Sequence, residues 1–72
     1  MQSEQKYFAN HLKQLRAQHN YTQADLAELV GVTRKTINTI ENRVFIPSAF
    51  LALKLAQVFK ITVEDIFYIE EH

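Results

Sequence analysis

The chain contains a single glycine, Gly31, and its position constrains the fold more than any other residue. Residues 26–30 before it place apolar side chains at helical spacing, and a helix end of this kind needs a residue with positive φ. Thr33 then opens a second segment that carries Ile37 and Ile40 on one helical face. The sequence therefore predicts two short helices joined by a tight turn.

The residues around this turn are those that two steeply crossing helices require. Ala27 has a small side chain where the two backbones approach, and Val32 fills the corner between them. Ile37 and Ile40 anchor the second helix by one face, so its opposite face is free to enter a DNA major groove. That free face has side chains able to hydrogen-bond base edges or phosphates: Arg34, Lys35, Asn38 and Thr39.

Capping residues divide the rest of the chain into three further helices. Leu12 and Leu15 share one face of a first helix, which ends near Asn20 in a left-handed conformation. Ser48, directly after Pro47, opens a helix that runs to about residue 60. The second and fifth helices each begin with a threonine followed three residues later by an aspartate, a form of the capping box: Thr22 with Asp25 and Thr62 with Asp65.

The two ends of the chain are ambiguous. Residues 67–69 (Phe-Tyr-Ile) favour a strand, and residues 6–8 (Lys-Tyr-Phe) fit either a partner strand or the approach to the first helix. The expected fold is therefore all-α with five helices, with or without a short terminal two-stranded β-ribbon. Residues 1–9 are expected to be an N-terminal extension, 10–67 the helix-turn-helix domain and 68–72 an acidic tail.

Composition excludes several functional classes. The chain has 72 residues, no cysteine and no glycine-rich loop, so it has no disulfide framework and no phosphate-cradling motif. His11, His19 and His72 are scattered, so we expect no metal site, no cofactor and no enzymatic activity. Five short helices leave little room for a small-molecule cavity. Without an apolar signal region or a membrane span, the protein is expected to be cytoplasmic.

The formal net charge is zero, but the charges are unevenly distributed. Residues 5–60 contain all eight Lys and Arg and only three acidic residues, a balance of +5. Residues 61–72 contain four acidic residues and no Lys or Arg, a balance of −4. This asymmetry suits a surface that binds a polyanion, with the acidic segment turned away from it.

Six segments together resemble the XRE/Cro-type helix-turn-helix family, which includes the lambdoid phage repressors, and in particular its short single-domain bacterial regulators: Gln23–Ala27, Gly31–Arg34, Thr36–Asn42, Pro47–Ser48, Leu51–Ala56 and Glu64–Phe67. The resemblance implies a lambda-repressor-like domain of five helices. It also implies a homodimer that binds a double-stranded DNA operator with two-fold symmetry. The expected function is transcriptional regulation, most simply repression by excluding polymerase from an overlapping promoter.

The resemblance also implies roles for individual residues. Arg34, Lys35, Asn38 and Thr39 correspond to base-contacting positions. The expected phosphate contacts lie around the two helices: Thr22, Gln23, Thr33, Thr36, Asn42 and Arg43. An arginine late in the first helix commonly pairs with the glutamate near the end of the recognition helix, which here predicts a structural ion pair between Arg16 and Glu41.

The chain departs from the family pattern at Arg43, where Gly or Asn is common, and at Phe50, which is often polar. The fourth helix is apolar nearly all round, so one face is available to a partner. The expected dimer contacts are Phe50, Leu53, Phe67, Tyr68 and Ile69. The alternative is a protein-interaction module on the same fold, such as an antitoxin subunit. That module would have no reason to gather Arg34, Lys35 and Asn38 on one exposed face.

Overall fold

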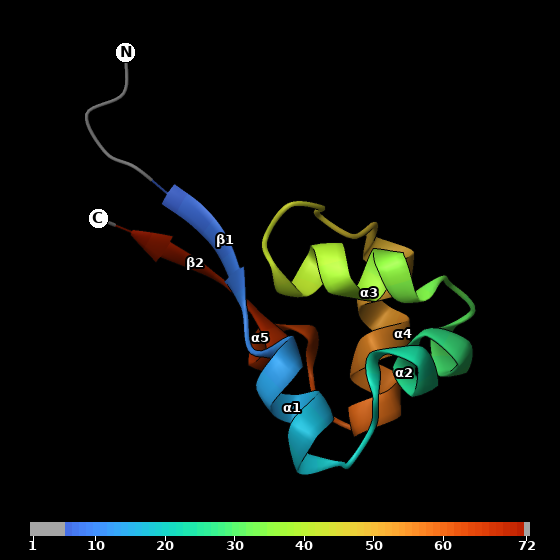
Figure 1. The fold of residues 1–72 in the computed structure, drawn as a ribbon. Helices are drawn as coiled ribbons and strands as arrows, with labels where there is room; N and C mark the ends of the chain where they lie inside the picture. The colour runs from blue at the N-terminus through green and yellow to red at the C-terminus, as the bar shows by residue number, and fades with distance from the viewer. Residues whose placement is uncertain (1–5, 72) are drawn as a thin grey trace.

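The computed structural model describes residues 6–71, and Figure 1 shows helices gathered at one end of a two-stranded ribbon. The elements are β1 (Lys6–Asn10), α1 (Leu12–Gln18), α2 (Gln23–Val30), α3 (Arg34–Glu41), α4 (Ala49–Phe59), α5 (Val63–Ile66) and β2 (Phe67–Glu71). The five predicted helices are confirmed, and of the two alternatives for the chain ends the ribbon is present. Within the described range, every helix is too short or too polar to cross a bilayer.

Side-chain caps begin the helices where the sequence predicts them. The hydroxyls of Thr22, Thr33, Ser48 and Thr62 each accept a hydrogen bond from a backbone N–H three residues further along. Asp25 and Asp65 complete two capping boxes by accepting from the backbone N–H of the capping threonine. Each cap satisfies N–H groups that the first turn of a helix leaves without a partner.

Left-handed residues end several helices. Gly31 has φ of 75° and closes α2, as its position predicts. Asn20 after α1 and Lys60 after α4 have φ of 60° and 59°. Arg43 has φ of 63°, so the position where the family commonly has Gly or Asn keeps the left-handed conformation with an arginine. The chain therefore leaves α3 by the usual route despite the substitution.

The core lies between α4 and the other helices. The buried face of α4 contains Leu51, Ala52, Leu55, Ala56 and Phe59. The other helices contribute Leu12, Leu26, Ala27, Val30, Ile37, Ile40 and Ile66, and β2 contributes Phe67. Ile37 and Ile40 are at most 1% exposed, so α3 is held to the core by one face. Its polar face is consequently left toward solvent.

The ribbon is continuous with this core. β1 pairs antiparallel with β2, with Phe8 opposite Ile69 and Asn10 opposite Phe67. The Phe8 and Phe67 rings stack with centroids 5.3 Å apart, and Ala9 is fully buried. The boundaries expected after residues 9 and 67 therefore fall inside the two strands. The ribbon packs with the helices, and the parts of the expected extension and tail at residues 1–5 and 72 lie outside the described residues.

Asn10 joins the ribbon to two helices. Its Oδ1 accepts from the N–H of Leu12, the first residue of α1, at 3.0 Å. Its Nδ2 donates to the Ile40 carbonyl at 3.0 Å, near the end of α3. One amide therefore fixes the angle at which the ribbon meets both α1 and α3.

The Asp25 carboxylate gives the start of α2 a defined pH dependence. Hydrogen bonds from the Thr22 backbone and side chain lower the pKa of Asp25 below its usual 3.8. A carboxyl group whose pKa is lowered on folding stabilises the fold above its unfolded pKa, and that stabilisation disappears as the pH falls through the folded pKa. We expect Asp25→Asn to destabilise the protein in urea titrations at pH 6. The difference from the parent should shrink below pH 3.8. A constant difference across this range would contradict the role of the charge.

Candidate nucleic-acid interface

The turn between α2 and α3 has the geometry that the sequence predicts. Ala27 is 3% exposed, and its carbonyl accepts from the Val32 N–H at 2.9 Å, which closes the turn. Val32 packs against the core at the corner. Lys54 reaches across from α4 and donates from Nζ to the Val30 carbonyl at 2.7 Å. A cation at the C-terminal end of α2 also compensates the helix dipole, so Lys54 stabilises the turn.

The solvent-facing side of α3 contains the residues predicted to contact bases. Arg34, Lys35 and Asn38 are exposed, with Arg34 and Lys35 in the first turn of α3 and Asn38 one turn after Arg34. Thr39 is only half-buried, and its hydroxyl donates to the Thr36 carbonyl at 2.9 Å. Thr39 therefore has an oxygen acceptor available but has already used its donor.

The residues predicted to contact phosphate surround this face. Thr22 and Thr33 are the N-caps of α2 and α3, and Thr36 shares a 3.1 Å hydroxyl contact with Thr33. Asn42 and Arg43 follow the last turn of α3 and are exposed. The threonines therefore lie at the N-terminal ends of α2 and α3, and Asn42 and Arg43 lie at the C-terminal end of α3. A phosphate backbone on either side of an inserted α3 would pass close to these two ends.

An ion pair lies beneath this surface. Arg16 Nε is 2.7 Å from Glu41 Oε2, and Arg16 Nη2 donates to Glu41 Oε1 at 3.3 Å. The Arg16 side chain is 15% exposed and that of Glu41 is 3% exposed. Arg16 Nη1 also donates to the Tyr21 carbonyl at 2.9 Å. The two residues predicted to pair are therefore in contact, and they connect α1 to the end of α3.

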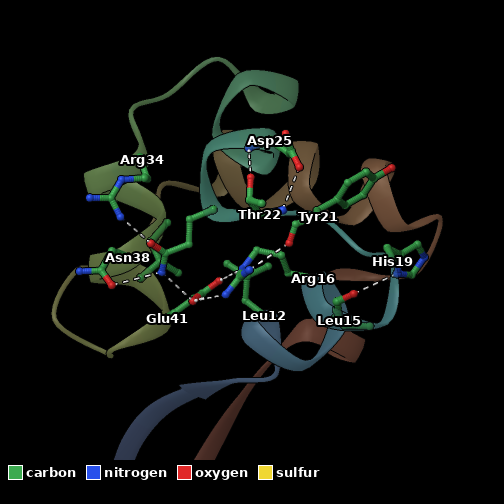
Figure 2. Close-up of polar contacts among 12 residues, drawn as sticks. Leu12, Leu15, Arg16, His19, Tyr21, Thr22, Asp25, Arg34, Asn38 and Glu41 are labelled. Atoms are coloured by element: carbon green, nitrogen blue, oxygen red, sulfur yellow. Dashed lines mark hydrogen bonds and ion pairs between the residues drawn. The ribbon is translucent and has the colours of Figure 1, made fainter.

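Figure 2 shows Arg16 and Glu41 joined by dashed contacts, and Gln23 extends this pair to the surface. Its Nε2 donates to Glu41 Oε1 at 3.1 Å and to Asn38 Oδ1 at 3.2 Å. Its Oε1 accepts from Arg34 Nη1 at 3.1 Å. Both ends of the amide are thus engaged within the protein. The phosphate contact expected of Gln23 stays a prediction. The structure adds contacts from Gln23 to Asn38 and Arg34 on the exposed face of α3.

The acidic end of the chain lies closer to this site than its charge suggests. Arg43 Nη1 donates to Glu70 Oε1 at 3.1 Å, with the two side chains 45% and 38% exposed. The acidic segment is therefore not wholly separate from the basic residues, because β2 places Glu70 beside the end of α3. Its orientation relative to DNA stays a prediction. Glu64 and Asp65 instead lie in the first turn of α5.

The residues expected at a dimer interface have different surroundings. Phe50 and Leu53 on α4 are 70% and 57% exposed, and Ile69 on β2 is 65% exposed. Tyr68 is half-buried, with its ring stacked 4.7 Å from that of His11. The expectation for Phe67 is corrected: it is 5% exposed and belongs to the core, because β2 turns this side chain inward against Phe8.

The helix-turn-helix segment of this chain matches a known protein family. Residues 12–66 match the family model described as "Helix-turn-helix". The chain belongs to the XRE-type helix-turn-helix family. The matched segment of this helix-turn-helix protein runs from the start of α1 to the end of α5 and leaves out both strands of the ribbon.

Relatives come from both bacteria and archaea. The chain is 47% identical over 62 residues to YgzD, an uncharacterized HTH-type transcriptional regulator of Bacillus subtilis, covering 86% of this chain and 94% of YgzD. It is 50% identical over 62 residues to another uncharacterized HTH-type transcriptional regulator, from Methanocaldococcus jannaschii, with the same coverage of 86% and 94%. A crystal structure of a candidate DNA-binding protein from Bacteroides fragilis has the same fold, with a TM-score of 0.76 at 23% identity over 85% of this chain and 98% of that one.

Sequence reasoning missed the contacts of Gln23 in this helix-turn-helix protein. Gln23 and Asn38 are 15 positions apart, and Gln23 and Glu41 are 18 apart. The pattern of apolar residues shows that α2 and α3 cross but does not show which polar side chains meet at the crossing. A glutamine at the first position of α2 is the one available signal, since that position faces the neighbouring helix across the turn.

Proposed function

We propose that this protein is a sequence-specific double-stranded DNA-binding transcriptional regulator that acts as a homodimer on an inverted-repeat operator. The observation that carries the proposal is the exposed polar face of α3, on which Arg34, Lys35 and Asn38 stand while Ile37 and Ile40 fix the opposite face. Membership of this family places the chain outside the enzymes. The named regulators among its relatives support the DNA-binding role.

The chemistry of this face fits the DNA major groove. An α-helix fits within a major groove about 12 Å wide, and the guanidinium of Arg34 can donate to both N7 and O6 of guanine. The threonine caps and Arg43 lie where they could meet phosphates on either side. Arg34 and Lys35 bring positive charge to the same surface, so binding should weaken steeply as salt rises, by a log–log slope of about −0.9 for each phosphate neutralised.

A dimer is required for useful specificity. One recognition helix reads only a few base pairs, and such a short site recurs too often in a genome to define an operator. The exposed Phe50 and Leu53 on α4 provide an apolar surface for a second copy. A two-fold dimer makes the site an inverted repeat with half-site centres about 34 Å apart. Bound across a promoter, such a dimer would repress by excluding polymerase.

Selection of bound sequences from random duplex DNA tests this proposal, together with footprinting and sedimentation of the complex. The proposal expects an inverted repeat, protection of two half-sites and two chains per duplex. Protection of a single half-site by a monomer at full affinity would reject the dimer. Failure to enrich any sequence would reject the DNA-binding function and favour the protein-interaction module.

The contact between Arg43 and Glu70 predicts a variant that binds DNA more tightly. Glu70→Gln removes a negative charge near the phosphates and frees Arg43 from an exposed ion pair, which itself contributes little to stability. We expect affinity for all duplexes to rise by about 2- to 5-fold at low salt, with the gain disappearing at high salt. Fluorescence anisotropy against cognate and scrambled duplexes measures this, with Glu64→Gln as the matched control. An unchanged affinity would show that Glu70 does not oppose binding.

A further inference from the structure

We infer that the side chain of Asn38 is locked to present its amide nitrogen, and not its oxygen, to the base that it contacts. This inference rests on the proposed DNA-binding function, and it specifies which hydrogen-bonding groups on the base Asn38 recognises. It predicts preference for a base whose major-groove edge offers acceptors and no amino donor, guanine or thymine. It also predicts rejection of the two-bond contact with adenine that an unconstrained asparagine can make.

The first constraint on Asn38 comes through Gln23, whose own orientation is fixed by charge. A guanidinium can only donate, so Arg34 requires the oxygen of Gln23, which it meets at 3.1 Å. The ionised carboxylate of Glu41 can only accept, so it requires the nitrogen of Gln23, which it meets at 3.1 Å. A reversed Gln23 amide would place two donors together at one end and two acceptors together at the other.

Because Gln23 is fixed in this way, the group it turns toward Asn38 is a donor. Gln23 Nε2 lies 3.2 Å from Asn38 Oδ1. A reversed Asn38 would oppose two NH₂ groups at this distance, with no acceptor between them. The arginine and glutamate therefore determine the orientation of Asn38 without touching it.

The second constraint is independent of the first and comes from Asn42. Its Nδ2 donates to the Asn38 backbone carbonyl at 3.0 Å, and a carbonyl can only accept. The same Nδ2 donates to Asn38 Oδ1 at 3.1 Å. Two donors, each fixed by a different partner, thus converge on one oxygen. Both acceptor positions of Asn38 Oδ1 are occupied within the protein.

What remains for DNA is the Nδ2 amino group of Asn38, on an exposed side chain beside Arg34 (Figure 2). In the major groove, guanine offers acceptors at N7 and O6 and thymine offers one at O4. Adenine places its N6 amino donor next to N7, and cytosine offers only its N4 donor. A fixed donor on the protein therefore meets only acceptors on guanine or thymine and only a donor on cytosine. On adenine it meets a single acceptor, N7, beside the opposing N6 donor, so the two-bond contact is lost.

The test is Asn38→Asp, in which the inner oxygen still accepts from Gln23 and Asn42 while the outer group becomes an acceptor. Sequences are selected from random duplex DNA by the parent, by Asn38→Ala and by Asn38→Asp. The Asn38→Ala variant identifies the base pair concerned, because its preference there is lost. At that pair the parent should favour guanine or thymine by about tenfold over cytosine, with adenine intermediate, and Asn38→Asp should favour cytosine or adenine. Parental selection of adenine at that pair would overturn the inference.

Removing one of the two donors to Asn38 Oδ1 provides a second test. Gln23→Met removes one of the two fixed donors, so Asn38 should accept adenine more readily and the parental preference should fall several-fold. Gln18→Met is the matched control, since Gln18 is exposed on α1 and has no place in this network. Thermal unfolding checks that both variants are folded. An unchanged preference in folded Gln23→Met would show that Gln23 does not position Asn38.

NMR of the free protein separates this inference from the proposed function. If no DNA sequence is selected, the function fails, but the orientation of Asn38 can still be measured. The Asn38 side-chain amide protons should exchange with water rapidly and show no cross-peaks to the side-chain amides of Gln23 and Asn42. Such cross-peaks would place the nitrogen inward and overturn the lock, whatever the protein binds.

Discussion

Replacing Arg16 with methionine should destabilise the fold by about 3–5 kcal/mol, because it leaves the carboxylate of Glu41 buried without its cation. Glu41 is 3% exposed, so water cannot replace the lost partner without opening the structure. The same change removes the donor that Arg16 provides to the Tyr21 carbonyl. Methionine keeps most of the apolar volume of the arginine stem, so the loss measures the charge and hydrogen bonds more than the packing.

The double variant Arg16→Met/Glu41→Met separates pairing from burial. Replacing both partners of a buried ion pair with apolar residues is often close to neutral, so the double variant should regain much of the stability lost in Arg16→Met. Urea unfolding of the parent, the two single variants and the double variant provides the cycle. Additive losses would mean that the two residues contribute independently and that the 2.7 Å contact carries no coupling.

The elements of this fold could be predicted because each has a local signal. Thr22 and Ser48 mark helix starts by offering a hydroxyl to N–H groups that would otherwise lack a partner. Gly31 and Asn20 mark helix ends because they tolerate positive φ. These helix starts and ends depend on a few neighbouring residues, so they can be predicted without the rest of the chain.

The ribbon and the acidic end were less predictable because they depend on contacts between the two ends of the chain. Residues 67–69 favour a strand, but only the partner in β1 and the stacking of Phe8 on Phe67 make the strand stable. The pairing register also decides which side chains point inward. It buries Phe67 and brings Glu70 to Arg43, and neither outcome follows from composition.

The candidate site also combines features that local sequence determines with features that depend on contacts distant in the sequence. The exposed face of α3 follows from helical periodicity, which separates Arg34 and Asn38 from Ile37 and Ile40. The orientation of those polar groups does not follow from periodicity, because it is set by Gln23 on another helix. The sequence therefore predicts which residues face solvent, while the crossing of α2 and α3 determines which atoms they present.

Arg34→Ala should strongly reduce sequence preference while leaving the fold intact. Arg34 is the first residue of α3 and is exposed, so its loss creates no cavity in the core. A bidentate contact to guanine contributes about 1–3 kcal/mol of discrimination, or roughly 5- to 150-fold, for each half-site. A dimer loses this contact twice, so affinity for the cognate inverted repeat should fall by at least about 25-fold. Affinity for a scrambled duplex should change far less.

Arg43→Ala separates loss of base reading from loss of positive charge. It removes the same charge at a position expected to contact phosphate, so it should weaken cognate and scrambled duplexes about equally and reduce the salt slope by about one per half-site. Anisotropy titrations at several salt concentrations measure both quantities, and circular dichroism confirms folding. If Arg34→Ala behaved like Arg43→Ala, with an unchanged ratio of cognate to scrambled affinity, Arg34 would be a phosphate contact. Specificity would then rest on the donor presented by Asn38, one turn further along the same face.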